Sequence, residues 1–180
     1  MQASASNPRA LLIIDMQVGM FSSDPPPFEG ERVLANINTL IAGARAAGAP
    51  IYAVRHTGPA GSPLAPDSAL TQLLPALAVD PARDTVFVKT RPNCFVGTGL
   101  AQWLAEAGVT ELVIAGMKTE YCVDATCRAA LDLGVRAVLI EDAHSTANTP
   151  ALDARDIIAH HNRTLNGPFV SLARTADFAF

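Results

Sequence analysis

Short apolar runs and longer amphipathic stretches alternate along this chain, and that alternation constrains the fold more than any other feature. Each run is only a few residues long, which fits strands that are buried on both faces of a sheet. The runs lie at residues 10–15, 51–56, 85–89, 111–116 and 136–141, with a weaker one at 169–172.

Between the runs, apolar residues recur at helical spacing. Val33, Ile37 and Leu40 form the first such stripe, and Gly48 ends it in the manner of a helix C-cap. The stretches lie at residues 31–47, 98–107, 119–133 and 150–165, the last beginning at a Thr149–Pro150 cap. This repetition predicts an α/β fold with a mostly parallel sheet, helices on both faces and right-handed crossovers.

A length of 180 residues suits one domain with a substantial core. We expect residues 1–8, which are polar, to be a disordered lead-in, and residues 9–180 to form a single domain. Two irregular segments, 23–28 and 57–67, are expected at the carboxyl ends of the strands, where α/β proteins bind their ligands.

Charge and cysteine content exclude several classes of function. The net charge is −4 and no block of Lys or Arg is present, which argues against a nucleic-acid or membrane partner. No apolar run approaches the ~20 residues of a membrane helix, and the first residues lack the features of a signal peptide. The three cysteines do not suggest a disulfide framework. We therefore expect a cytoplasmic protein with free thiols.

Three reactive side chains fall at the ends of predicted strands. Asp15 closes the first run, Lys89 closes the third, and Cys122 follows the fourth. Taken singly, each has an ordinary structural interpretation: a helix cap, a lysine reaching to solvent, and a small core residue. Because the carboxyl ends of parallel strands share one edge of a sheet, the three are predicted to meet in one cleft.

This combination of residue types suits nucleophilic catalysis. A helix N-terminus and a neighbouring ammonium favour a thiolate, and a carboxylate can accept the thiol proton and return it to a leaving amine. Lysine is scarce in this chain, since only Lys89 and Lys118 occur among 13 Lys and Arg residues. A low-pKa Cys122 would react with iodoacetamide well below about pH 8.

The runs LLIIDMQ (11–17), VKT (88–90) and AGMKTEYCVDATCRAALDLG (115–134) resemble the isochorismatase-like cysteine hydrolases. That family includes nicotinamidases and N-carbamoylsarcosine amidohydrolase. The resemblance implies a three-layer α/β/α, Rossmann-like sandwich on a six-stranded, mostly parallel sheet. It also implies that Asp15, Lys89 and Cys122 are the catalytic triad. A cis peptide is implied at Met117–Lys118, with the N–H groups of Lys118 and Cys122 forming an oxyanion hole.

Nicotinamidases hold a metal with an Asp-x-His pair and a further His, and this chain departs from that pattern. Val54 stands two residues before His56 where the pair requires Asp. We therefore predict no metal and no cofactor, and we interpret His56 as a polar residue at a strand end or in the cleft.

The predicted substrate-binding wall combines loop residues with the neighbours of the nucleophile. It consists of Gln17, Phe21, Phe95, Met117, Tyr121 and His144. Phe21 and Phe95 could equally cover the core. Cys94 is predicted to face the cleft, whereas Cys127 should point elsewhere on its helix and be inert.

The leading functional prediction is metal-independent hydrolysis of a small-molecule amide or related C–N bond through a Cys122 thioester. One alternative is the vinyl-ether hydrolysis of isochorismatases, whose members with that activity lack the nucleophilic cysteine. Another is a non-catalytic ligand-binding or redox-sensing module. The expected partners are a small-molecule substrate and further copies of the chain, in a dimer or tetramer.

Overall fold

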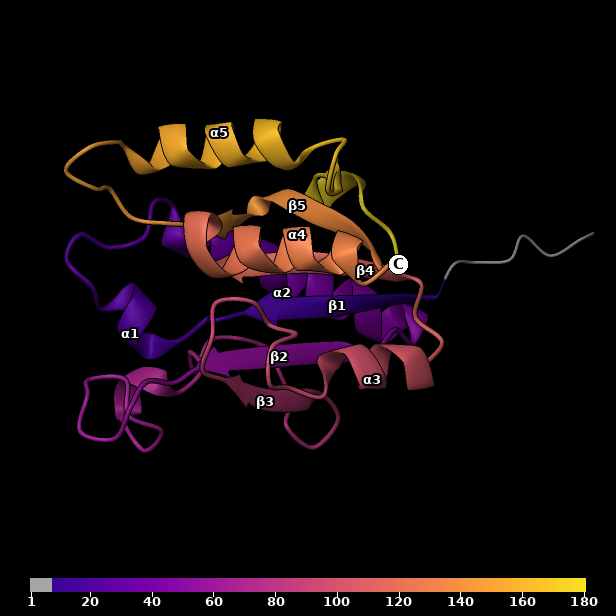
Figure 1. Ribbon diagram of the computed structural model, residues 1–180, viewed down its shortest axis with the longest axis horizontal. Helices are drawn as coiled ribbons and strands as arrows, with labels where there is room; N and C mark the ends of the chain where they lie inside the picture. The colour runs from indigo at the N-terminus through magenta and orange to yellow at the C-terminus, as the bar shows by residue number, and fades with distance from the viewer. Residues whose placement is uncertain (1–7) are drawn as a thin grey trace, which may run out of the picture.

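A six-stranded sheet forms the centre of the computed structural model, which describes residues 8–180 (Figure 1). The strands are β1 (Arg9–Ile14), β2 (Ile51–His56), β3 (Thr85–Lys89), β4 (Glu111–Met117), β5 (Arg136–Ser145) and β6 (Ser171–Ala173). Their order is β3-β2-β1-β4-β5-β6, and every neighbouring pair is parallel. The predicted mostly parallel α/β fold is confirmed.

Helices cover both faces of the sheet (Figure 1). They are α1 (Val18–Phe21), α2 (Gly30–Ala47), α3 (Leu100–Glu106), α4 (Asp124–Asp132) and α5 (Ala154–Leu165). Alternate β1 residues point to opposite faces: Leu12 and Ile14 pack in the core with α3 and α4, while Leu11 and Ile13 pack with α2. The resulting three layers explain why residues 10–14 are apolar throughout rather than alternating.

The strand order places a topological switch point between β1 and β4. The chain adds β2 and β3 on one side of β1, then crosses to β4 and continues outward through β5 and β6. Ligands in such sheets bind beyond the carboxyl ends of the strands at this point. In Figure 1 those ends lie on the left, beside α1 and the long loop that follows β2.

Several predicted boundaries are corrected. The start of the last helix at Thr149–Pro150 is wrong, because the Thr149 hydroxyl accepts from the N–H groups of Ala151 and Leu152 and forms a turn instead. The helix begins at Ala154. Helix α1 was not expected, since four residues are too few to show a helical period. The predicted lead-in, residues 1–8, lies outside the described residues except for Pro8.

The described helices include none that is both long and apolar enough to cross a membrane.

Gly116 permits a close approach between the two central strands, β1 and β4. It pairs with Ile14 of β1 and has a φ of 123°. A Cβ atom added there would lie 2.1 Å from the Ile14 carbonyl oxygen, far inside any tolerable contact. The position therefore requires glycine, both for its backbone conformation and for the separation of β1 and β4.

We predict that Gly116→Ala lowers the free energy of unfolding by about 3 kcal/mol or more, because β1 and β4 must separate to admit the methyl group. Gly48→Ala is the matched control: Gly48 also has a positive φ, but a Cβ there would meet nothing within 4 Å. Its cost should be about 1 kcal/mol. Urea unfolding followed by circular dichroism measures both, and equal losses would contradict the steric argument.

Candidate active site

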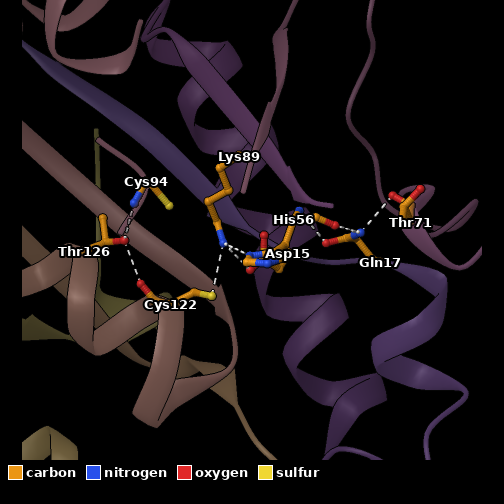
Figure 2. Close-up of polar contacts among 8 residues, drawn as sticks. All are labelled: Asp15, Gln17, His56, Thr71, Lys89, Cys94, Cys122 and Thr126. Carbon is orange, nitrogen blue, oxygen red and sulfur yellow. Dashed lines mark hydrogen bonds and ion pairs between the residues drawn. The ribbon is translucent and has the colours of Figure 1, made fainter. Parts of the chain in front are cut away.

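Lys89 and three partners form a buried polar cluster at the carboxyl ends of the strands (Figure 2). The Lys89 ammonium Nζ lies 2.8 Å from Asp15 Oδ2, 2.9 Å from His56 Nδ1 and 3.1 Å from Cys122 Sγ. Lys89 is 1% exposed, and the side chains of Lys89 and Asp15 are both fully buried. The structure therefore brings the predicted Asp15, Lys89 and Cys122 together, with His56 as a fourth member.

Asp15 owes its position to a sharp turn of the chain after β1. Its φ is 50°, an uncommon value for a residue other than glycine. Its N–H donates to the Val54 carbonyl, and its own carbonyl accepts from the Gln17 N–H. The turn aims the carboxylate at Lys89. The second carboxylate oxygen, Oδ1, is buried and has no hydrogen-bond partner among residues 8–180, so it is free to accept a proton.

Cys122 lies in a π-helical turn, Thr119–Val123, that joins β4 to α4. Such turns are frequent at functional sites. The Cys122 carbonyl accepts from the Thr126 hydroxyl at 2.6 Å, and the same hydroxyl accepts from the Cys94 N–H at 3.1 Å. The π-helical turn is thereby tied to the loop that follows β3. The Met117–Lys118 peptide before this turn is cis, as the resemblance implies; the oxyanion hole stays a prediction.

The electrostatics of the cluster favour a neutral thiol beside a carboxylate. Burial, followed by the neighbouring Asp15, raises the pKa of Cys122 to about 12, and Lys89 opposes this rise only in part. The expectation of a low-pKa thiolate is therefore wrong, because burial outweighs the ammonium. Burial also raises the pKa of Asp15, with Lys89 opposing. A carboxylate with a raised pKa is a better proton acceptor.

Lys89 keeps its charge in this environment. Burial alone would lower its pKa, but the charge of Asp15 and the hydrogen bond that Lys89 donates to Asp15 raise it, and the net direction is upward. The ammonium is thus a permanent cation beside the sulfur. It can stabilise a thiolate once the proton has left.

The cluster does not fit a metal ion while Lys89 occupies it. Ligand-type atoms of Asp15, His56 and Cys122 lie within 4.8 Å of one another. The Lys89 ammonium, however, contacts all three, and a divalent cation at that point would meet a buried positive charge at contact distance. Val54, which stands where an Asp-x-His pair would need its acid, is fully buried in the sheet.

A cavity of about 270 Å³ opens beside Cys122. Its walls are Met20, His56, Leu64, Pro92, Lys118, Tyr121 and Cys122. Tyr121 is the one member of the predicted substrate-binding wall that lines it. Leu64 comes from the predicted irregular segment 57–67, whereas Met20 lies in helix α1, which was not expected; both residues were missed. No periodic signal marks single residues in such loops.

The other predicted wall residues lie elsewhere, each for a physical reason. Met117 is fully buried in the core beneath α2. Phe21 packs against that same core, and Phe95 packs against the core on the opposite face. Cys94 is also fully buried and does not face the cavity.

Gln17 is a structural clamp rather than part of the cavity wall (Figure 2). It is 1% exposed, and its amide nitrogen donates to the carbonyls of His56 and Thr71 at 3.0 and 2.9 Å. Its amide oxygen accepts from the His56 N–H at 2.8 Å. Gln17 thus fixes the end of β2, and with it the backbone of His56.

His144 braces three elements from within the core. Its Nε2 lies 2.8 Å from Asn162 Oδ1 of α5, and its Nδ1 lies 2.9 Å from the Thr119 hydroxyl. Burial lowers its pKa to about 4, so the ring is neutral. His144 borders a separate cavity between α2 and α5, and the predicted contact with a ligand beside Cys122 is not supported.

Comparisons with known proteins show which family of proteins this chain is similar to. The isochorismatase domain model matches residues 9–161. Streptothricin hydrolase of Streptomyces noursei is 42% identical over 144 residues, which are 79% of this chain and 51% of that protein. This chain therefore spans about half the length of that relative. The uncharacterized isochorismatase family protein YddQ of Bacillus subtilis is 32% identical over 178 residues, 94% of this chain and 97% of that protein.

A solved structure from the same family is also similar to this chain. The crystal structure of an isochorismatase family protein superposes with a TM-score of 0.88 at 36% identity. The match covers 94% of this chain and 99% of that one.

Iodoacetamide should alkylate Cys122 alone in the native protein. Cys94 and Cys127 are fully buried, whereas Cys122 borders the cavity, and burial also raises the pKa of the Cys94 and Cys127 thiols. The Cys122 rate should still be rising at about pH 9, where an ordinary thiol of pKa about 8.5 is mostly ionised. Peptide mass spectrometry after timed quenching measures this, with urea-unfolded protein as the control in which all three react. An alkylation rate that reaches a plateau below pH 8 would show instead that Cys122 has a low pKa.

Burial of neutral His144 should make the fold less stable in mild acid. An unfolded histidine binds a proton near pH 6.5 while the folded one does so near 4, so stability is lost as pH falls through this window. The loss is about 3 kcal/mol for a shift of this size. Urea unfolding at several pH values should show a flatter profile for His144→Gln than for wild type. His160→Gln, which alters an exposed ring, should keep the wild-type slope; identical slopes in all three proteins would refute the assignment.

Proposed function

Because this chain belongs to the isochorismatase family, and so to a family of hydrolases, we propose that it cleaves a small-molecule amide or related C–N bond with Cys122 as nucleophile. The observation that carries the proposal is the Lys89 ammonium, which joins Asp15 Oδ2 to Cys122 Sγ, a sulfur whose residue lines a cavity. The proposed reaction needs no metal.

The first half of the reaction transfers an acyl group to sulfur. The Asp15 carboxylate takes the thiol proton, and its unpartnered Oδ1 supports this role. The Cys122 sulfur then attacks the substrate carbonyl and forms a C–S bond, while Lys89 stabilises the negative charge passing between sulfur and carboxylate. Protonated Asp15 gives its proton to the departing nitrogen as the C–N bond breaks. A thioester and a free amine result.

The second half returns the enzyme to its starting state. Asp15, again ionised, takes a proton from water, and the resulting hydroxide attacks the thioester carbonyl. The C–S bond breaks, and the Cys122 sulfur recovers the proton from Asp15 as the carboxylic acid leaves. One water is consumed per bond cleaved, and no redox partner is required.

The cavity limits the size of the substrate. A volume of about 270 Å³ lies near the lower end for small-molecule sites. Met20, Leu64 and Pro92 make much of its wall apolar. These features favour a compact amide with an apolar body.

The redox-sensing alternative fits the site less well. Sensor cysteines are low-pKa and solvent-accessible, whereas Cys122 is 8% exposed and has a raised pKa. Vinyl-ether hydrolysis would proceed without Cys122, so comparing the turnover of a vinyl ether by wild type and by Cys122→Ala tests this alternative.

Cys122→Ala should reduce amide hydrolysis by about a thousandfold or more, because the whole acyl-transfer route depends on the sulfur. The panel comprises small aromatic and cyclic amides, together with streptothricin, after which one relative is named. Released amine measures turnover, and an acid-quenched reaction analysed by intact mass should show the thioester. Cys127→Ala is the matched control and should retain activity. Equal turnover by wild type and Cys122→Ala would overturn the mechanism.

A further inference from the structure

His56 is the member of the polar cluster that the proposed reaction does not use. It is the last residue of β2, is half-buried, and borders the cavity beside Cys122. Its Nδ1 lies 2.9 Å from Lys89 Nζ, and its backbone is clamped on both sides by Gln17. Such a firmly held ring at the cavity wall is suited to a defined task.

The contact with Lys89 determines which ring nitrogen carries the proton. An ammonium has three donors and no acceptor, and Lys89 has three neighbours at hydrogen-bond distance: Asp15 Oδ2, His56 Nδ1 and Cys122 Sγ. His56 Nδ1 must therefore accept. Burial, with Lys89, lowers the pKa of His56, so the ring is neutral and its single proton is on Nε2.

The Nε2–H group, on the edge of the ring opposite Lys89, is therefore the one N–H donor of the His56 side chain. Among residues 8–180, His56 Nε2 makes no hydrogen bond, and it is not among the buried unpartnered atoms. Because His56 borders the cavity, this N–H is available to a molecule that occupies it. Since Lys89 stands where a metal would have to bind, His56 is free for this role.

We propose that His56 is a substrate-binding residue whose Nε2–H donates a hydrogen bond to a carbonyl oxygen on the acyl side of the substrate. This proposal rests on the proposed function, which identifies the site. It extends that function by naming the chemical group of the substrate that the cavity binds. The preferred substrates are then compact carbonyl compounds with an oxygen acceptor close to the attacked carbon. Amines and ethers that lack a carbonyl are rejected, since they leave this donor unpaired.

Two substitutions separate the two edges of the ring. In His56→Asn the side-chain oxygen can still accept from Lys89, but no donor reaches the Nε2 position. In His56→Gln the longer side chain can place an N–H donor near the position of Nε2. It leaves no acceptor at the position of Nδ1, where the native ring contacts Lys89. The pair therefore tests contact with the cavity against contact with Lys89.

The readout is the rate of Cys122 modification by two probes at one pH. Iodoacetamide carries an amide carbonyl next to the attacked carbon, and methyl methanethiolsulfonate carries no carbonyl. The ratio of the two rates cancels changes in thiol reactivity. We expect this ratio to fall about three- to tenfold in His56→Asn, as the loss of one hydrogen bond implies, and to change less than about twofold in His56→Gln.

Three results would overturn the proposal. An unchanged ratio in His56→Asn shows that the ring makes no contact with the carbonyl. A larger fall in His56→Gln than in His56→Asn shows that His56 acts only through Lys89. Stoichiometric zinc in wild-type protein dialysed against zinc chloride, absent from His56→Asn, identifies His56 as a metal ligand instead.

A measurement on the wild-type protein guards against variants that do not fold. Nitrogen NMR of the histidine rings should show His56 as the neutral Nε2–H form, and added acetamide should shift its Nε2 signal saturably while propylamine should not. A proton on Nδ1, or equal responses to the two probes, would overturn the proposal. Neither probe experiment requires turnover. A positive result beside an inactive amide panel would therefore reject the hydrolase proposal alone.

Discussion

The buried ammonium of Lys89 is the interaction on which the site depends. A lysine this deeply buried is strongly unfavourable unless it is paired and hydrogen-bonded. The three partners come from three other segments: the turn after β1, the end of β2, and the π-helical turn after β4. Satisfying one cation therefore holds four separate parts of the chain in register, and the reactive atoms are positioned as a consequence.

The sheet makes this convergence possible. With the order β3-β2-β1-β4-β5-β6, the carboxyl ends of β1, β2, β3 and β4 are consecutive along one edge. Gly116 allows β4 to approach β1 closely, which brings the turn that carries Cys122 over the end of β1. Gln17 and Thr126 then tie the neighbouring loops to the cluster. Packing, rather than local conformational preference, sets the distances between the groups of the cluster.

Burial shapes the chemistry as much as proximity does. It raises the pKa values of both Asp15 and Cys122, so the resting site holds a neutral thiol beside a basic carboxylate and a fixed cation. The partial positive charge of a helix N-terminus by itself would favour a Cys122 thiolate. Removing the thiolate from water has the opposite effect and outweighs it. The corrected arrangement still supports acyl transfer, with Asp15 moving the proton as the sulfur attacks.

Much of this protein could be derived from its amino-acid order. The apolar runs indicated each strand, and the residues that closed or followed three of them, Asp15, Lys89 and Cys122, were predicted to meet because parallel strands share an edge. The wall of the cavity could not be derived in this way. Aromatic or polar character does not say whether a loop side chain turns toward the core, as for Phe21 and Phe95, or toward a hydrogen-bonding partner, as for Gln17 and His144.

Local sequence thus determined the strands, the longer helices and the chemical groups at the strand ends, since hydrophobic periodicity and residue type are properties of short segments. Tertiary structure alone decided that His56 contacts Lys89, that Met20, Leu64 and Pro92 line the cavity, and that burial keeps the thiol protonated. These features depend on distances between segments far apart in the chain, and on how completely water is excluded from the space between them.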